Sequence, residues 1–178
     1  PKAALIALWE GREVAEISIT LPKGETPVFA LAHCASGDGW AEAGIVKDAG
    51  DDPDVTHGAL IVARVASSTG GITFHAGKGV GTITRPSLPL AVGEAAINPV
   101  PRSLMCAVVE EMAATCGKDA NIAITISIPG GEELAAKTWN PRLGIVGGLS
   151  VLGTTGVVRP FSCAAWIASI HRGVDVAI

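Results

Sequence analysis

The sequence predicts an α+β domain in which two or three helices pack against a mixed, largely antiparallel sheet. Segments with the two-residue period of a strand outnumber segments with the period of a helix. Several of these strands follow one another across short turns and do not alternate regularly with helices. The strictest alternation, at Ile122, Ile124, Ile126 and Ile128, predicts a strand with one buried face.

The composition limits the classes of protein to which the chain can belong. Its 178 residues suffice for one domain, and 48% of them are hydrophobic, enough to fill a core. A net charge of −4 without a cluster of lysines and arginines argues against nucleic acid as a partner. No charge-free stretch is both long and glycine-poor enough to span a bilayer, so no membrane partner is expected. The four cysteines are far apart, which fits a reducing cytoplasm and predicts no metal site.

The first elements are a helix and a hairpin. Residues 2–8 resemble the end of a helix. Two alternating runs joined by a turn at residues 22–25 predict a hairpin over residues 13–33. A loop at residues 36–39 and a strand at residues 41–47 follow.

The middle of the chain is again strand-rich. Residues 60–65, with the sequence LIVARV, predict a buried strand that turns at residues 67–71 and returns at residues 72–74. Asn98 and the prolines after it predict the start of a helix that continues, with apolar residues at helical spacing, to Gly117.

The last elements flank a glycine-rich stretch. Glu132 and Glu133 open a short helix directed toward Lys137, because acidic side chains suit a helix N-terminus. Ser162 is the predicted N-cap of a final helix.

The loop after the strand at residues 41–47 holds four aspartates within seven residues, followed by a histidine. Like charges this close repel, so either a carboxyl pKa rises or a cation or ligand hydroxyl satisfies them. The order does not match a calcium-binding EF-hand loop, because the terminal glutamate is missing. The alternative is a solvated turn in which the aspartates cap backbone N–H groups. The candidate catalytic residues come from this loop: Asp48, Asp51, Asp52 and His57.

The most unusual stretch runs from Leu143 to Val158, which is uncharged and repeatedly broken by glycine. Glycines at this density predict turns with positive φ or the close approach of another group. We interpret the stretch as strand, glycine loop and short strand, with loop N–H groups free to meet a ligand. The alternative is a tightly packed crossing of the core. The candidate cofactor-binding residues are Gly144, Gly147, Gly148, Gly153, Thr154, Thr155 and Gly156.

A second glycine loop spans residues 77–82 and offers Lys78 to an anion. It does not fit the Walker pattern, because Gly79 follows the lysine where serine or threonine is required. It also lacks the Rossmann order of glycines. The alternative is the end of a hairpin.

Three long blocks of the sequence, in order and at natural spacing, resemble one family. They are AGIVKDAGDDPDVTHGALI at residues 43–61, GKGVGTITRPSLPLAVGEAAINPVPR at residues 77–102, and ISIPGGEELAAKTWNPRLGIVGGLSVLGTTGVVRPFS at residues 126–162. They are similar to the CbiD family, the cobalt-precorrin-5B C1-methyltransferases of cobalamin biosynthesis. By this resemblance, residues 1–178 correspond to the N-terminal portion of a family member. The opening segment of the family, similar to Gly-Thr-Thr-Gly-x-Cys-Ala, and its C-terminal α/β portion are not in the chain.

The resemblance implies methyl transfer from S-adenosylmethionine, a co-substrate, to C1 of a cobalt-containing tetrapyrrole, giving cobalt-precorrin-6A. The cobalt belongs to the substrate, so no metal site of the protein is required. The substrate carries acetate and propionate carboxylates, which basic side chains bind well. The candidate substrate-binding residues are Lys78, Arg85, Arg102, Arg142 and Arg159.

Two further expectations accompany the resemblance. The glycine stretch and the acidic loop are expected to form two walls of one cavity. The alternative function is that of a non-catalytic fragment that binds an anionic ligand; whether the protein forms a homo-oligomer is left open.

Overall fold

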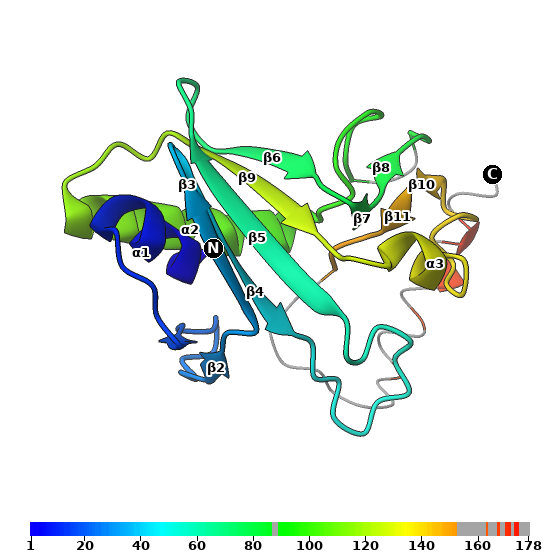
Figure 1. Ribbon diagram of the computed structural model, residues 1–178. Coiled ribbons are helices and arrows are strands. Elements are labelled where there is room, and N and C mark those ends of the chain that lie inside the picture. The colour runs from blue at the N-terminus through cyan, green and yellow to red at the C-terminus, as the bar shows by residue number, and fades with distance from the viewer. Residues whose placement is uncertain (87–88, 153–162, 164–166, 168–169, 172, 175–178) are drawn as a thin grey trace.

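The structure is a computed structural model that describes residues 1–86, residues 89–152 and the single residues 163, 167, 170, 171, 173 and 174 (Figure 1). Its helices up to residue 152 are α1 (Lys2–Glu10), α2 (Pro99–Cys116) and α3 (Gly131–Ala135). Its strands are β1 (Glu16–Ser18), β2 (Val28–Ala30), β3 (His33–Gly37), β4 (Trp40–Val46), β5 (Leu60–Ser67), β6 (Thr73–Ala76), β7 (Gly79–Val80), β8 (Thr82–Ile83), β9 (Ile122–Ser127), β10 (Ile145–Val146) and β11 (Gly148–Leu149). The predicted α+β class is confirmed.

A five-stranded sheet with the order β3-β4-β5-β9-β6 forms the centre of the fold. Strands β3, β4, β5 and β9 are each antiparallel to the next one in this order, and β6 runs parallel to β9. Residues 72–74 were expected to pair with the strand that precedes them, β5, and this prediction is wrong. Strand β9 arrives from much later in the chain and lies between β5 and β6, where it pairs with both.

Helices α1 and α2 cover one face of this sheet. Ile122, Ile124 and Ile126 of β9 are buried, and they share a hydrophobic core with Leu5 of α1 and Val109 of α2. Their burial alternates along β9, as the sequence pattern predicts. Figure 1 shows α2 running behind the strands, so that the opposite face of the sheet points toward the viewer.

The other predicted elements are largely confirmed. Helix α2 starts after Asn98 and ends at Gly117, which caps it in the left-handed conformation (φ 63°). Strands β1 and β2 form the predicted hairpin. Strand β3 continues through residue 37, which was expected to belong to a loop, because it pairs with β4 as far as Trp40. The helix predicted after Ser162 begins outside the described residues.

Helix α3 and the short strands β7, β8, β10 and β11 form a small unit beyond the end of β9. Ile83 of β8 and Ile145 of β10 form a separate small core with Ala96, whereas α3, β7 and β11 pack into the main core. None of the helices in the described part of the chain is long and apolar enough to cross a membrane.

Candidate functional site

The two glycine-rich segments that the sequence singles out lie side by side. Strand β7 pairs with β11 in parallel, with Gly79 opposite Gly148. Strand β8 pairs with β10 in the antiparallel direction, with Ile83 opposite Ile145. The loop at residues 77–82 and the described part of the stretch after Leu143 therefore form one structural unit.

Three glycines let the backbones of this unit approach closely, and we call Gly79, Gly131 and Gly148 the glycine junction. A Cβ atom on Gly148 would lie 2.3 Å from the carbonyl oxygen of Gly79, and one on Gly131 would lie 2.2 Å from the same oxygen. A Cβ atom on Gly79 would lie 1.9 Å from the carbonyl oxygen of Ile128. Any side chain at these positions would displace backbone, so Gly148 has a packing role in the structure.

The other two described glycines of the stretch differ from each other. Gly144 has φ 75°, and its carbonyl oxygen accepts hydrogen bonds from the backbone N–H and the Oγ1 hydroxyl of Thr84, at 2.8 and 2.6 Å. Gly147 has φ 87°, is exposed, and has open space where a Cβ would lie. Gly147 is thus the described glycine at which a ligand could approach the backbone. Gly153, Thr154, Thr155, Gly156 and Arg159 lie outside the described residues.

Basic side chains surround this unit. The side chain of Arg85 lies against Gly144, and its Nη1 donates to the carbonyl oxygen of Arg142 at 3.5 Å. The Arg142 guanidinium lies over the exposed Trp139 ring, 5.1 Å from its centroid. Lys78 is exposed at the start of the first glycine segment. Arg85 and Arg142, from distant parts of the sequence, are therefore in contact through the backbone of Arg142, and both are exposed.

The guanidinium of Arg102, by contrast, is already bound to other groups of the protein. Its Nε donates to the carbonyl oxygen of Ile97 at 2.8 Å, and its Nη2 donates to that of Ala95 at 3.0 Å. The same nitrogen lies 3.0 Å from a carboxylate oxygen of Glu94. Arg102 lines an open hollow of about 560 Å³ beside β6. These contacts give Arg102 a structural role, and its predicted role toward a substrate stays a prediction.

The acidic loop is organised by one internal ion pair. Lys47 Nζ donates to a carboxylate oxygen of Asp54 and, at 2.5 Å, to the Thr56 hydroxyl. Asp54 also accepts from the backbone N–H and the hydroxyl of Thr56, both at 2.7 Å. Partial burial acts to raise the pKa of Asp54, but these hydrogen bonds together outweigh it, so the pKa lies below its usual value. Lys47 thus supplies the cation for one of the four carboxylates, that of Asp54.

The candidate catalytic residues lie around this pair. Asp48 is 85% exposed, and its Oδ1 accepts from the backbone N–H of Gly50 at 2.8 Å, as in a capped turn. His57 Nδ1 accepts from the backbone N–H of Ala49 at 3.1 Å. The same nitrogen lies 3.8 Å from Asp48 Oδ1. Asp51 is exposed, whereas Asp52 is half-buried.

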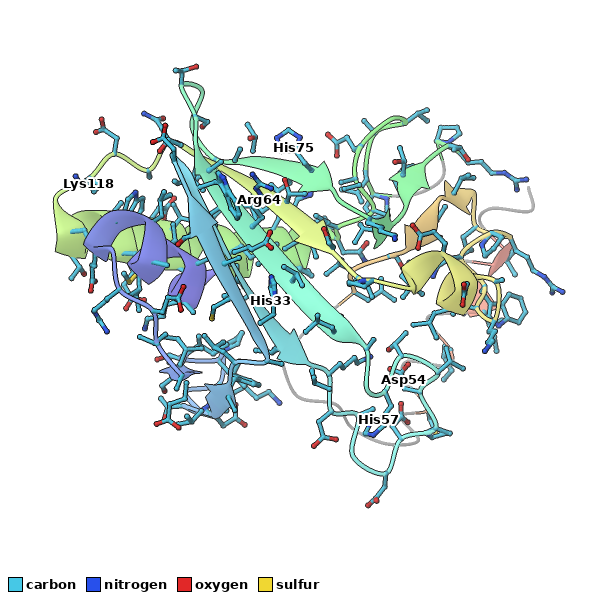
Figure 2. The ribbon with its side chains drawn as sticks, in the orientation of Figure 1. His33, Asp54, His57, Arg64, His75 and Lys118 are labelled. Carbon is cyan, nitrogen blue, oxygen red and sulfur yellow. The ribbon has the colours of Figure 1, made fainter. Side chains whose placement is uncertain are left out.

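The expected cavity between the acidic loop and the glycine stretch stays a prediction. The two best-formed hollows in the described part of the chain are lined by neither segment. Figure 2 shows the labelled Asp54 and His57 on the loop beyond the ends of β4 and β5, while α3, β10 and β11 lie beyond the end of β9. Within the same described residues, no group of three or more metal-ligating side chains is present.

Comparison with known proteins places the chain in a family. The family model CbiD matches residues 1–160. The chain belongs to the CbiD family.

Curated relatives of this CbiD chain carry the name cobalt-precorrin-5B C(1)-methyltransferase. One from Brucella anthropi is 64% identical over 178 residues, which cover 99% of this chain and 48% of that protein. Another, from Brucella canis, is 62% identical with the same coverage. The chain therefore spans about half the length of the curated relatives it matches.

A solved structure supports the same fold. The cobalamin biosynthesis protein CbiD from Archaeoglobus fulgidus is similar with a TM-score of 0.66 and 27% identity. The similarity covers 96% of this chain and 55% of that one. The central sheet and its helices are thus those of a CbiD protein.

One group of polar residues in this CbiD chain was missed by sequence reasoning. Arg64 stands on β5, and its guanidinium carbon lies 3.8 Å from the centroid of the Trp40 ring on β4. Beside them, His33 Nε2 and Glu42 Oε1 form a hydrogen bond of 2.8 Å. The signal was present, because a charged residue in the middle of LIVARV is unexpected in a buried strand.

We expect Asp54→Asn to lower the free energy of unfolding of the full-length protein by about 1–3 kcal/mol at pH 7, because Lys47 loses its charged partner. A carboxyl whose pKa is depressed in the folded state stabilises the protein above its unfolded pKa. That contribution is lost as the pH falls through the lower folded pKa, so the wild type and the variant should converge in acid. Chemical denaturation at pH 7 and near pH 3 checks this. Asp48→Asn, which keeps the turn acceptor, is the control; an equal effect in both variants would contradict the assignment.

Proposed function

We propose that the chain is the N-terminal half of an enzyme that methylates C1 of cobalt-precorrin-5B, with S-adenosylmethionine as the methyl donor. The observation that carries this proposal is 64% identity along 99% of the chain to a protein named for that activity. The match covers both glycine segments and the acidic loop, because it extends over 99% of the chain.

The reaction requires little covalent work from the protein. The bond between sulfur and the methyl group breaks, its electron pair stays on sulfur, and the sulfonium becomes a neutral thioether. An electron pair of the macrocycle forms the new bond from C1 to the methyl carbon. Such a displacement depends mainly on holding the two reactants close and in line.

The acceptor is a ring with several carboxylates, which suits the basic side chains beside the glycine junction. We propose that Arg85, Arg142 and Lys78, with Arg159, bind these carboxylates. Guanidinium groups bind carboxylates with two parallel hydrogen bonds and so fix both position and orientation. The solvent-open placement of Arg85 and Arg142 supports this role.

The donor is a sulfonium attached to a nucleoside, and it needs backbone contacts and hydroxyl partners. We propose that Gly147 and the segment from Gly153 to Gly156, with Thr154 and Thr155, supply them. The open space at Gly147 supports the proposal. Asp48, Asp51, Asp52 and His57 are proposed to bind ribose hydroxyls or to accept a proton from the macrocycle.

The test uses the full-length protein that contains this chain. Incubation with cobalt-precorrin-5B and methyl-labelled S-adenosylmethionine is expected to transfer one labelled methyl group to C1, detected by mass spectrometry and NMR. Absence of transfer by a folded protein that still binds the tetrapyrrole would favour the alternative of a non-catalytic ligand-binding protein. Absence of both transfer and binding would overturn both functions.

A further inference from the structure

The face of the central sheet opposite α1 and α2 carries a row of polar side chains. The strand registers align Glu42 with Arg64, Arg64 with Thr125, and Thr125 with His75. Paired residues of neighbouring strands point to the same face, so these four side chains cross β4, β5, β9 and β6 in one line. Figure 2 shows the labelled His33, Arg64 and His75 spread across the sheet from its β3 side to its β6 side.

Arg64 is the unusual member of this row. It is exposed, it stacks on Trp40 at 3.8 Å, and no hydrogen bond or ion pair in the described part of the chain uses its guanidinium. Stacking on an indole restricts the guanidinium plane while leaving its N–H donors free. Arg102 differs from Arg64 in this respect, because its Nε and Nη2 both donate to backbone carbonyl oxygens.

The neighbouring carboxylate, that of Glu42, forms its hydrogen bond with a residue other than Arg64. Glu42 lies directly opposite Arg64, but its carboxylate bonds to His33 on the other side, at 2.8 Å. Both members of that pair are partly exposed, with 35% of the His33 and 22% of the Glu42 side chain accessible. The same face of the sheet carries three residues with small side chains, Ala35, Ala66 and Ala123. These side chains project little from the sheet.

We propose that this face is a carboxylate-binding surface on which Arg64, held by Trp40, binds a carboxylate of a flat acidic ligand. The ligand follows from the proposed function, on which this inference rests: it is the tetrapyrrole substrate, carrying acetate and propionate groups. The N–H donors of the guanidinium can bind a carboxylate. The alanines on this face leave room for a flat ring to lie on the sheet.

The experiment measures binding of a stable corrinoid by calorimetry with the full-length protein. Cobyrinic acid, a cobalt corrinoid with free carboxylates, is compared with its methyl ester, in which those charges are removed. Arg64→Gln is expected to raise the Kd for the acid about 10-fold, the equivalent of roughly 1.4 kcal/mol, and to leave that for the ester unchanged. Arg12→Gln is the matched control, because Arg12 pairs with Glu10 at the end of α1 and loses the same charge.

Unchanged binding of the acid by a folded Arg64→Gln protein would overturn the inference. An equal loss with acid and ester would also overturn it, because the contact would not involve a carboxylate. Unchanged binding with a lower melting temperature or an altered oligomeric state would assign the face to another part of the protein or to a second copy. Methyl transfer by the wild type is measured separately. If transfer is absent but carboxylate-dependent binding is present, the proposed function is rejected while the carboxylate-binding surface is retained.

Discussion

Replacing Gly79 by alanine is expected to lower the free energy of unfolding by about 4 kcal/mol. Two effects combine. Gly79 has φ 77°, which costs an L-residue roughly 1–2 kcal/mol. The added Cβ would also lie 1.9 Å from the carbonyl oxygen of Ile128, so backbone on two elements must move. Thermal melting should show a decrease of roughly 10 °C.

Gly71→Ala is the matched control for this experiment. Gly71 has nearly the same backbone angle, φ 76°, but open space where the Cβ would lie. We therefore expect it to lose only the conformational part, about 1–2 kcal/mol. Equal losses in the two variants would show that the close approach at the glycine junction does not contribute.

The double variant Arg85→Gln/Arg142→Gln is expected to reduce kcat/KM for the tetrapyrrole about 100-fold or more in the full-length enzyme. Each guanidinium–carboxylate contact contributes about 1.5–3 kcal/mol, and roughly 1.4 kcal/mol corresponds to a factor of ten. Glutamine keeps the part of the Arg85 stem that lies against Gly144, so the fold should be preserved. Steady-state kinetics with varied tetrapyrrole and saturating S-adenosylmethionine measures the effect.

Arg12→Gln serves again as the control of equal charge change, and it should leave kcat/KM unchanged. Retention of full activity by the double variant, with normal circular dichroism, would remove Arg85 and Arg142 from the substrate site. A loss confined to the KM for S-adenosylmethionine would assign the two arginines to the donor instead.

Local patterns were sufficient to predict most elements of the fold. The alternating isoleucines of β9 and the proline-to-glycine limits of α2 are visible in the sequence because each depends on neighbouring residues. The position of β9 between β5 and β6 could not be predicted in this way. It depends on pairing across a long connection, and a turn after β5 indicates a return without specifying the partner.

The candidate site, too, could be predicted only as far as it depends on neighbouring residues. The density of glycines predicts either a bound ligand or the close approach of another backbone segment. Choosing between the two requires knowing which group lies against each glycine. For Gly148 that partner is Gly79, which no local pattern connects with it. In the acidic loop, the crowded charges predicted either a raised carboxyl pKa or a cation or ligand hydroxyl, and Lys47 supplies a cation to Asp54. The charge of Arg64 within LIVARV is visible in the sequence, but its stacking on Trp40 depends on the strand registers.

The pairing of β7 with β11 and of β8 with β10 has a consequence for biosynthesis. When the ribosome has released β7 and β8, the strands that complete them have not yet been translated, and α2 and β9 must emerge first. The nascent chain therefore carries two short, unfinished strands through a considerable part of its elongation. Chaperone binding at this stage would protect those edges until β10 and β11 leave the exit tunnel.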